Sequence, residues 1–395
     1  MSPLLPSQHP LLQVMFELYA ILTNVGTERN FNLSIGSKVA DRRRSAAGKL
    51  GEAAAVLAMV AAVTLAVATR VHAQAVPSAV AVLAGDRGDI REALRGSKAG
   101  ATIIVRPGRY DLSGTTLPAN IVLYAPDGAT IVGSIAIPGP NTVIRGFTFE
   151  GGTVDLSKSQ SVSVGQCVFL GGTTSIKVDD ATNALIINND FRKVTGGVIT
   201  GWSLDRSTIS GNHFIDCGQC INLDFNNDRT RGRDIVIERN VFRGTTRMPI
   251  EVGPLGAYTE DLVVRDNWAA DFKNRGPDPG QSMSTFVAYS IVPTHGVNSH
   301  IVNNYAIAGN RGAGAIGIEL DGSGEIYGNK VEDFSYGAVV YGAGFNVHDN
   351  SFVNATQAPV LNYAHRLGRM ERNDTGIERV RVPPSLPQRR LWPSQ

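Results

Sequence analysis

Two glutamates and one arginine carry side chains whose types and spacing could support acid–base chemistry and the binding of an anion. Glu251 lies in the segment MPIEVG (248–253), Glu319 lies in AIGIELDG (315–322), and Arg247 directly precedes the first segment. A pair of carboxyl groups can act as general acid and general base on a glycosidic bond. The planar guanidinium of arginine suits the carboxylate of a uronic acid. The competing interpretation is that both glutamates are solvated surface residues and that Arg247 is a surface partner of Glu251.

The same part of the chain supplies further polar residues for a substrate or a metal ion. Strand alternation in CINLDF (220–225) and AIGIELDG places Asn222, Asp224 and Asp321 on the same side as the two glutamates. Ca²⁺ binds through oxygen ligands of this kind, so calcium is a candidate cofactor, and the sequence fixes no set of metal ligands. In a lyase, Ca²⁺ or Arg247 would neutralise a uronate carboxylate while a base removes the neighbouring proton.

A long insert contributes two more candidates. The 37 residues that separate Asn267 from Asn304 form the longest interval between the repeated asparagines of this chain. Long loops on a repeat protein gather on its binding face. Within this insert, Tyr289 could stack on a sugar ring and His295 could serve as a base. The alternative for His295 is a structural or surface role.

A repeated scaffold must position these residues. A pattern of two or three short β-branched runs, separated by polar turns, recurs along the chain, and its turn asparagine returns every 21–37 residues. Repeats of this length are typical of a solenoid, in which each coil packs on its neighbours. The recurring asparagines are Asn189, Asn212, Asn240, Asn267, Asn304, Asn329, Asn350 and Asn373.

The asparagines are interpreted as scaffold rather than as chemistry. Stacked coils lie about 4.8 Å apart, so that equivalent turns come into register. A buried side-chain amide can then bond to the coils above and below it. The aromatic residue two positions later is expected to stack inside the tube, as at Phe191, Phe214, Phe242 and Phe352.

The coil spacing also predicts the distance between the two candidate catalytic strands. One coil, with a strand expected at 285–290, separates the strand of Glu251 from that of Glu319. Two coil steps place these strands about 9.6 Å apart. This is near the upper end of the spacing that inverting glycosidases use between their acid and base.

The composition restricts the class of protein. The chain has 395 residues, 43% of them hydrophobic, and a formal net charge of +2, so its charge does not indicate a nucleic-acid partner. Three cysteines are too few for a disulfide scaffold. The motif formed by Cys217 and Cys220 is expected to be a local disulfide or two free thiols.

The N-terminal region has the features of an export signal. Three arginines at 42–44 and Lys49 precede the apolar run 53–68, and small residues at Ala73 and Ala75 follow as cleavage candidates. The run is short for a membrane span, so we expect no transmembrane anchor after removal of the signal. The expected organisation is an extension plus signal peptide at 1–75, a β-helix domain at 76–375 and a Pro/Arg-rich tail at 376–395.

The segment DIREALR (89–95) predicts a short amphipathic helix that would cap the first coil. Together with ATIIVRPGRYDL (101–112) and the coils that follow, it resembles the pectin-lyase-like superfamily. That resemblance implies a single-stranded right-handed parallel β-helix of about ten coils, an all-β fold, with ligands along the strand that follows the loop after the asparagine turn. The catalytic Asp-Pro-His-Asp of mannuronan epimerases is missing, because Asp278-Pro279-Gly280 lacks the histidine.

The expected function is therefore action on a polysaccharide, which could contain uronic acid, by a lyase or a glycoside hydrolase. The alternative is a non-catalytic carbohydrate-binding or structural protein of the cell surface or periplasm. In either case we expect an exported monomer, periplasmic or extracellular, with no nucleic-acid partner. The resemblance specifies a fold and does not by itself supply an activity.

Overall fold

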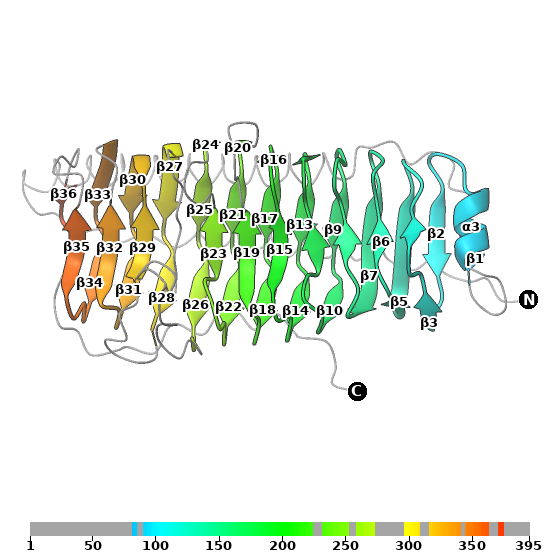
Figure 1. The fold of residues 1–395 in the computed structure, drawn as a ribbon, viewed down its shortest axis with the longest axis horizontal. Coiled ribbons are helices and arrows are strands. Elements are labelled where there is room, and N and C mark those ends of the chain that lie inside the picture. Colours follow the sequence, from blue (N-terminus) through cyan, green and yellow to red (C-terminus); the bar gives the residue numbers. More distant parts are fainter. Residues whose placement is uncertain are drawn as a thin grey trace, which may run out of the picture. The chain divides into compact units, whose positions relative to one another are not determined.

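The described residues form a stack of parallel β-coils (Figure 1). The computed structural model describes residues 81–84, 90–223, 231–252, 258–272, 296–308, 316–340, 344–362 and 370–374. These residues belong to one compact unit, Val76–Gln395. The expected signal peptide and the expected tail lie outside them. No helix in the described ranges is long and apolar enough to cross a membrane.

Each coil contributes short strands to two or three ladders, and every pairing joins equivalent strands of successive coils in parallel. The first ladder of the 26-stranded sheet contains β1 (Ala81–Ala84), β2 (Thr102–Val105), β5 (Val122–Val132), β7 (Val143–Glu150), β9 (Ser163–Gly165), β13 (Leu185–Ile187), β17 (Thr208–Ser210), β21 (Val236–Glu238), β25 (Val263–Arg265), β27 (Gly296–Val302), β30 (Gly322–Tyr327), β33 (Gly344–His348) and β36 (Met370–Glu371).

The second ladder of that sheet begins after the next turn of each coil. It contains β3 (Arg109–Asp111), β10 (Val168–Leu170), β14 (Asp190–Arg192), β18 (His213–Ile215), β22 (Val241–Arg243), β26 (Trp268–Ala270), β28 (Tyr305–Ile307), β31 (Lys330–Glu332) and β34 (Ser351–Val353). A third ladder of two- and three-residue strands, here called the corner strands, contains β12 (Ala181–Thr182), β16 (Leu204–Asp205), β20 (Arg231–Arg233) and β24 (Tyr258–Glu260).

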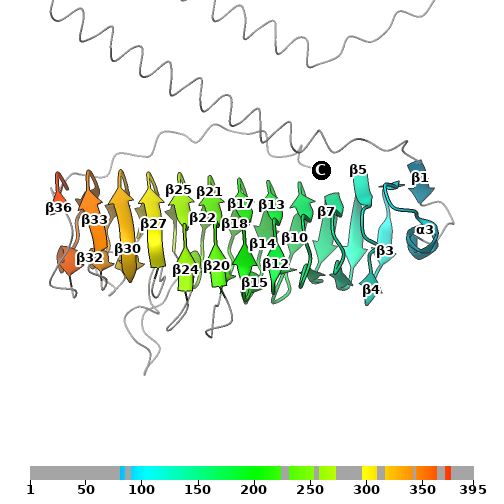
Figure 2. The same cartoon turned by 90° about the horizontal axis from the view of Figure 1, so that it is seen from above.

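Two further sheets form the remaining wall. The seven-stranded sheet contains β4 (Thr115–Thr116), β6 (Ile135–Ala136), β8 (Val154–Asp155), β11 (Ile176–Lys177), β15 (Gly197–Gly201), β19 (Gln219–Leu223) and β23 (Ile250–Val252). The three-stranded sheet contains β29 (Ile316–Leu320), β32 (Tyr336–Val340) and β35 (Ala358–Asn362). Figure 2 shows how these narrow strands repeat side by side along the stack.

The asparagine ladder is confirmed. From Asn189 to Asn373, the side-chain oxygen of each asparagine accepts hydrogen bonds from the backbone N–H and the side-chain amide of the preceding one. Each of these asparagines directly follows a residue with a positive φ, for example Asn188 (55°) and Arg239 (53°). In an earlier coil, Cys167 takes the same position, and its N–H donates to the Asn189 side chain at 3.0 Å.

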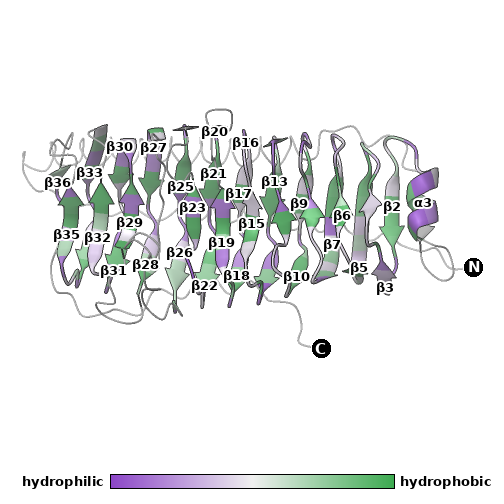
Figure 3. Cartoon of the chain, viewed as in Figure 1, coloured by the Kyte–Doolittle hydropathy of each residue, from purple (hydrophilic) through white to green (hydrophobic). Residues whose placement is uncertain are grey.

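The predicted aromatic stack is confirmed for three of its four members. The rings of Phe149, Phe169, Phe191, Phe214 and Phe242 follow one another at 4.8–4.9 Å between centroids, and all are buried. Phe352 is also buried, but its position in the ladder is reached only after Ala269, Ala306 and Val331. Figure 3 shows the apolar segments recurring in successive coils. The core is thus one continuous column.

The expected capping helix is present as α3 (Ile90–Gly96), at the first coils of the stack. Ile90 and Leu94 are each 2% exposed and belong to the main core, whereas most of the helix is hydrophilic (Figure 3). The helix contacts β1 and β2. It therefore covers apolar side chains that the first coils would otherwise expose.

Candidate functional site

From β8 to β23, the outer face of the seven-stranded sheet presents a polar side chain at each successive coil. The pairing register places Asp155, Lys177, Thr200, Asn222 and Glu251 in one row across β8, β11, β15, β19 and β23. The neighbouring row of Val154, Ile176, Ile199, Ile221 and Ile250 is completely buried in the core. The prediction that Asn222 and Glu251 face outward is therefore confirmed.

The carboxylate of Glu251 is half-buried and held by a side chain of the preceding coil. The side-chain amide of Gln219 donates a hydrogen bond to it. Gln219 is itself only 5% exposed, so this amide is confined by its surroundings. A carboxylate that is oriented by a buried amide and still partly reaches solvent has the placement that a general acid or base requires.

Arg247 is exposed and lies before β23, on the approach to Glu251. Within the described part of the chain it makes no ion pair with Glu251 or with another carboxylate. The interpretation of Arg247 as a surface partner of Glu251 is thus not supported. Its guanidinium remains accessible to a ligand.

The expectation that Glu319 lies on one outward, accessible ridge with Glu251, two coil steps away, is wrong in its accessibility. Glu319 does face away from the core residues Ile318 and Leu320, but it is 2% exposed. The outer face of the three-stranded sheet carries an apolar cluster, with Met248, Ile316 and Val339 buried and Tyr336 and Leu361 packed against them. Glu319 pairs in register with Val339 of that cluster.

Ile316 belongs to this outer cluster and not, as alternation predicts, to the main core. The register between β29 and β32 pairs Ile316 with Tyr336 and Ile318 with Ala338. Gly317 and Gly337, which lie between these positions, do not form a pair. A Cβ atom on Gly317 would lie 2.6 Å from the carbonyl oxygen of Gly337. This close approach requires glycine and interrupts the simple alternation of sides.

The remaining predicted site residues divide between described and undescribed parts of the chain. Asp321 is half-buried, between β29 and β30, and its carbonyl accepts a hydrogen bond from Gly296 at 3.3 Å. Asp224, Tyr289, His295 and the strand expected at 285–290 lie outside the described residues. Among the described residues, no group of three or more His, Cys, Asp or Glu side chains could hold a metal ion.

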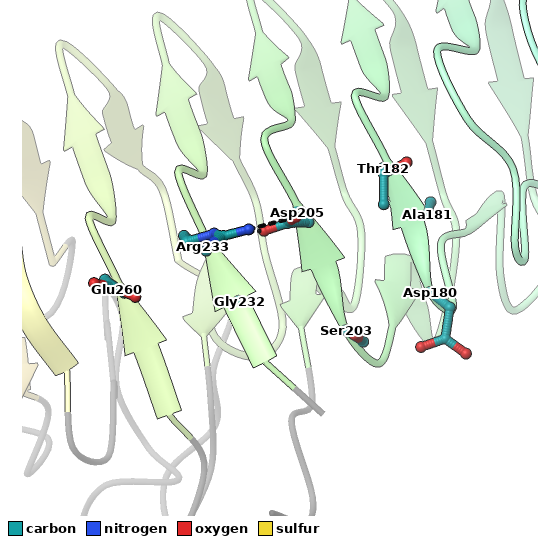
Figure 4. A pocket seen from close by; sticks show the side chains of 8 residues that line it. All are labelled: Asp180, Ala181, Thr182, Ser203, Asp205, Gly232, Arg233 and Glu260. Carbon is teal, nitrogen blue, oxygen red and sulfur yellow. Dashed lines mark hydrogen bonds and ion pairs between the residues drawn. The ribbon is translucent and has the colours of Figure 1, made fainter. Parts of the chain in front are cut away.

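A polar groove along the corner strands escaped the sequence analysis. It has a volume of about 390 Å³ and is lined by Asp180, Ala181, Thr182, Ser203, Asp205, Gly232, Arg233 and Glu260 (Figure 4). Asp205 raises the pKa of Arg233 through a hydrogen bond, so the guanidinium stays charged. These residues come from four coils, and only the register of the strands brings them together.

Trp202 lies in sequence between β15 of the outer face and Ser203 of the groove. It directly follows β15, and its side chain is 52% exposed. Its backbone N–H donates to Asp179 at 3.0 Å, and its carbonyl accepts from the N–H of Asp180 at 2.8 Å. Asp179 also forms an ion pair with Lys177 at 2.7 Å and thereby raises the pKa of that lysine. An exposed tryptophan beside polar side chains is a common feature of surfaces that bind ligands.

The three cysteines are not joined by a disulfide bond. Cys167, Cys217 and Cys220 are all free thiols and buried. Burial raises the pKa of Cys217 to about 11 and that of Cys167 to about 12, and raises the pKa of Cys220 as well. Of the two alternatives for the Cys217–Cys220 motif, the structure has two free thiols.

Comparison with known proteins concerns the fold. The family model described as "Right handed beta helix region" matches residues 134–277. No curated protein sequence matches the chain. The surface adhesin PfbA of Streptococcus pneumoniae is similar at 11% identity and a TM-score of 0.45, over 72% of this chain and 88% of that one.

Two other solved structures are similar at the same level. The A-module of the Azotobacter vinelandii mannuronan C-5 epimerase AlgE6 is 12% identical with a TM-score of 0.48, over 73% of this chain and 93% of that one. The tailspike protein of E. coli bacteriophage HK620 is 11% identical with a TM-score of 0.37, over 72% of this chain and 59% of that one. Identities this low carry no activity over to this chain. With the parallel pairing of successive coils, the family match identifies the fold as a right-handed parallel β-helix.

Proposed function

We propose that this protein binds a polysaccharide along the outer face of the seven-stranded sheet and cleaves it with Glu251 as the acid or base. The observation that supports this most directly is the outward row of Lys177, Thr200, Asn222 and Glu251, one residue per coil. Such a row presents hydrogen-bonding groups at intervals of about 4.8 Å. A polymer of hydroxylated rings offers partners that repeat in the same way, and Trp202 offers an apolar surface for a ring.

The chemistry would depend on Glu251 and the charges around it. The Gln219 amide holds one side of the carboxylate, which leaves the partly exposed side for a substrate proton. Arg247 is exposed and could bind an acidic or hydroxyl group of the polymer. In a hydrolase Glu251 would protonate the leaving oxygen or activate water, and in a lyase it would remove a proton next to a carboxylate.

Non-catalytic binding is the second candidate, and one observation favours it. Glu319 was expected to be the second catalytic carboxylate beside that of Glu251. It is 2% exposed, so it does not present a carboxylate to a bound sugar. Hydrolysis needs two carboxyl groups about the bond. The binding surface that we propose for either function is the same.

We also propose that the protein acts outside the cytoplasm as a monomer. Support comes from the basic and apolar segments at 42–68 and the small residues that follow them. Expression in a bacterial host, followed by N-terminal sequencing of the mature protein, tests the first part. A mature N-terminus near residues 74–76 is expected, and an intact N-terminus on cytoplasmic protein would contradict it.

Activity is tested with a panel of uronic-acid and neutral polysaccharides, with and without Ca²⁺. Ultraviolet absorbance from unsaturated uronates and the release of reducing ends are followed together. A rise in both indicates a lyase, and reducing ends without absorbance indicate a hydrolase. Glu251→Gln should reduce either rate by about 10²-fold or more, whereas Asp127→Asn, at an exposed position within β5, should not. Equal rates for Glu251→Gln and the wild type would overturn the catalytic assignment. Binding without cleavage would favour the second candidate.

A further inference from the structure

We propose that the groove along the corner strands is a saccharide subsite selective for an amino sugar with a protonated amine. This inference rests on the proposed function in one respect, because it assumes that the chain binds a carbohydrate. It goes further by naming a second part of the binding surface and the charge of the unit that occupies it.

The shape of the groove suits a segment of a chain molecule. The register places Thr182, Asp205, Arg233 and Glu260 on four successive coils, so the lining extends over three coil steps, about 14 Å. Its volume of about 390 Å³ lies within the range of about 300–1,000 Å³ for small-molecule sites. Figure 4 shows Asp180 and Glu260 on opposite sides of the central Asp205–Arg233 pair.

The charges within the groove are unequal. Asp180, Asp205 and Glu260 supply three carboxylates, and Arg233 is the one guanidinium among the lining residues. Asp205 is already paired with Arg233 at 3.3 Å and with Arg206 at 2.6 Å. The carboxylates of Asp180 and Glu260 therefore decide which ligand is preferred. They attract an ammonium group and repel a uronate.

A metal ion would be the simplest cation for such a groove, but the geometry does not suit one. The carboxylates belong to three different coils, and the described residues contain no group of three or more potential ligands close enough to hold a metal. A divalent metal needs several oxygen ligands around one point. An organic cation with hydroxyl groups distributed along its length can use carboxylates that lie far apart.

Trp202 adds the second element of sugar recognition. The residue lies between two parts of the lining, since Asp180 bonds to its carbonyl and Ser203 follows it in sequence. Its exposed indole can cover the apolar face of a sugar ring while the carboxylates bond to the hydroxyl and amine groups. The groove and the outer face of the seven-stranded sheet would then bind neighbouring parts of one polymer.

The test compares three probes of equal length by calorimetry at low ionic strength: chitosan oligomers, N-acetylated chitin oligomers and oligogalacturonates. Low salt is needed because salt screens exposed charges. Wild-type protein should prefer chitosan over chitin oligomers by about fivefold or more, with oligogalacturonate weakest. Asp180→Asn and Glu260→Gln should each reduce this preference, because loss of the negative charge weakens chitosan binding more than chitin binding.

The variants are designed to preserve the fold. Asp180 has a φ of 54°, a conformation that asparagine tolerates well. Asp127→Asn provides the same change of charge at an exposed position within β5, outside the groove. Two results would overturn the selectivity of the groove without affecting the proposed polysaccharide function. One is equal affinity of the wild type for chitosan and chitin oligomers. The other is an equal loss of the chitosan preference in Asp180→Asn and in Asp127→Asn. If no oligosaccharide and no polymer binds to the wild type, the proposed function itself fails.

Discussion

The buried asparagines have the most demanding hydrogen-bond requirements of the described residues. Asn240 is 0% exposed, its amide donates to Ile209 at 2.9 Å and to Asn267 at 3.0 Å, and its oxygen accepts two bonds from Asn212. Every one of these partners is itself enclosed in the stack. Removal of one side chain would therefore leave buried polar groups of two neighbouring coils without partners.

We expect Asn240→Ala to lower the free energy of unfolding by about 3 kcal/mol, because each buried group left without a hydrogen bond costs about 1–3 kcal/mol. Chemical denaturation followed by circular dichroism measures the change. Gln160→Ala is the control, since that amide is exposed and its loss should cost little. Equal stability of the two variants would show that the ladder does not carry the stability assigned to it.

The buried thiols make the free energy of unfolding depend on pH, and it should decrease at alkaline pH. The folded state keeps the thiols of Cys167, Cys217 and Cys220 protonated because burial raises their pKa. Unfolded cysteines lose their protons near pH 8.5. Above that pH the native state binds more protons than the unfolded state, so the stability contribution of these thiols is complete at neutral pH and falls between about pH 8.5 and 12.

A thiol-reactive dye measures the same property. Native protein at pH 8 should react slowly, and unfolded protein should titrate as three thiols without added reductant. Substitution of all three cysteines by alanine should weaken the decline of stability above pH 8.5. A count of one thiol would indicate a disulfide between Cys217 and Cys220, and rapid labelling of native protein would contradict their burial.

Single residues were predictable where the coil repeat alone decides their environment. The asparagines and Phe191, Phe214 and Phe242 face the interior in every copy of the repeat, so their roles follow from spacing. The burial of Glu319 was not predictable. Strand alternation predicts on which side of the sheet a side chain lies, but it does not predict what covers that side. Two members of the outer cluster, Met248 and Val339, are 91 residues apart in sequence.

At the scale of elements, α3 is the part whose loss should affect the stack as a whole. Ile90 and Leu94 attach it to the core, next to the parallel pair β1–β2. An exposed coil end offers unpaired strand edges to other molecules. The amphipathic pattern of residues 89–95 was sufficient to predict this helix and its place.

We expect Leu94→Asp to detach the helix and promote self-association, because a carboxylate cannot remain in an apolar core without a partner. Analytical ultracentrifugation before and after mild heating measures the effect. Glu92→Ala, an exposed position on the same helix, should behave as the wild type. A Leu94→Asp variant that stays monomeric with unchanged thermal stability would show that α3 is not a cap.

The sheets also differ in a way that the sequence did not reveal. The seven-stranded sheet presents polar side chains outward, whereas the three-stranded sheet carries an apolar cluster, and Glu319 in that sheet is buried. Both have similar alternation in sequence, but Gly317 and Gly337 lie where coils of the three-stranded sheet approach closely, and Ile316 belongs to the outer cluster. The expected acid–base pair of Glu251 and Glu319 required the outer faces of both sheets to be equally accessible to a substrate.

At the scale of the whole molecule, the stack creates surfaces from residues that are far apart in the chain. The groove of Asp180, Asp205, Arg233 and Glu260 uses side chains from four coils, each ordinary in its own segment. These side chains come together only because the coils stack in one register. The repeats differ in length, so a fixed sequence spacing does not show which residues become neighbours. The sequence therefore predicted the fold and the outward row of Asn222 and Glu251, but not the groove.

The measurement that tests the account most directly is polysaccharide binding by affinity electrophoresis, with Trp202→Ala compared with the wild type. Trp202 lies in sequence between β15 of the outer face and Ser203 of the groove, so its loss should reduce retention by at least one neutral or amino-sugar polymer about tenfold, as expected for removal of a stacking aromatic ring. Met370→Ala, which removes another exposed apolar side chain, 57% exposed in β36, should be retained like the wild type. Equal retention of all three proteins, or no retention of the wild type by any polymer, would contradict the claim that this face binds polysaccharide.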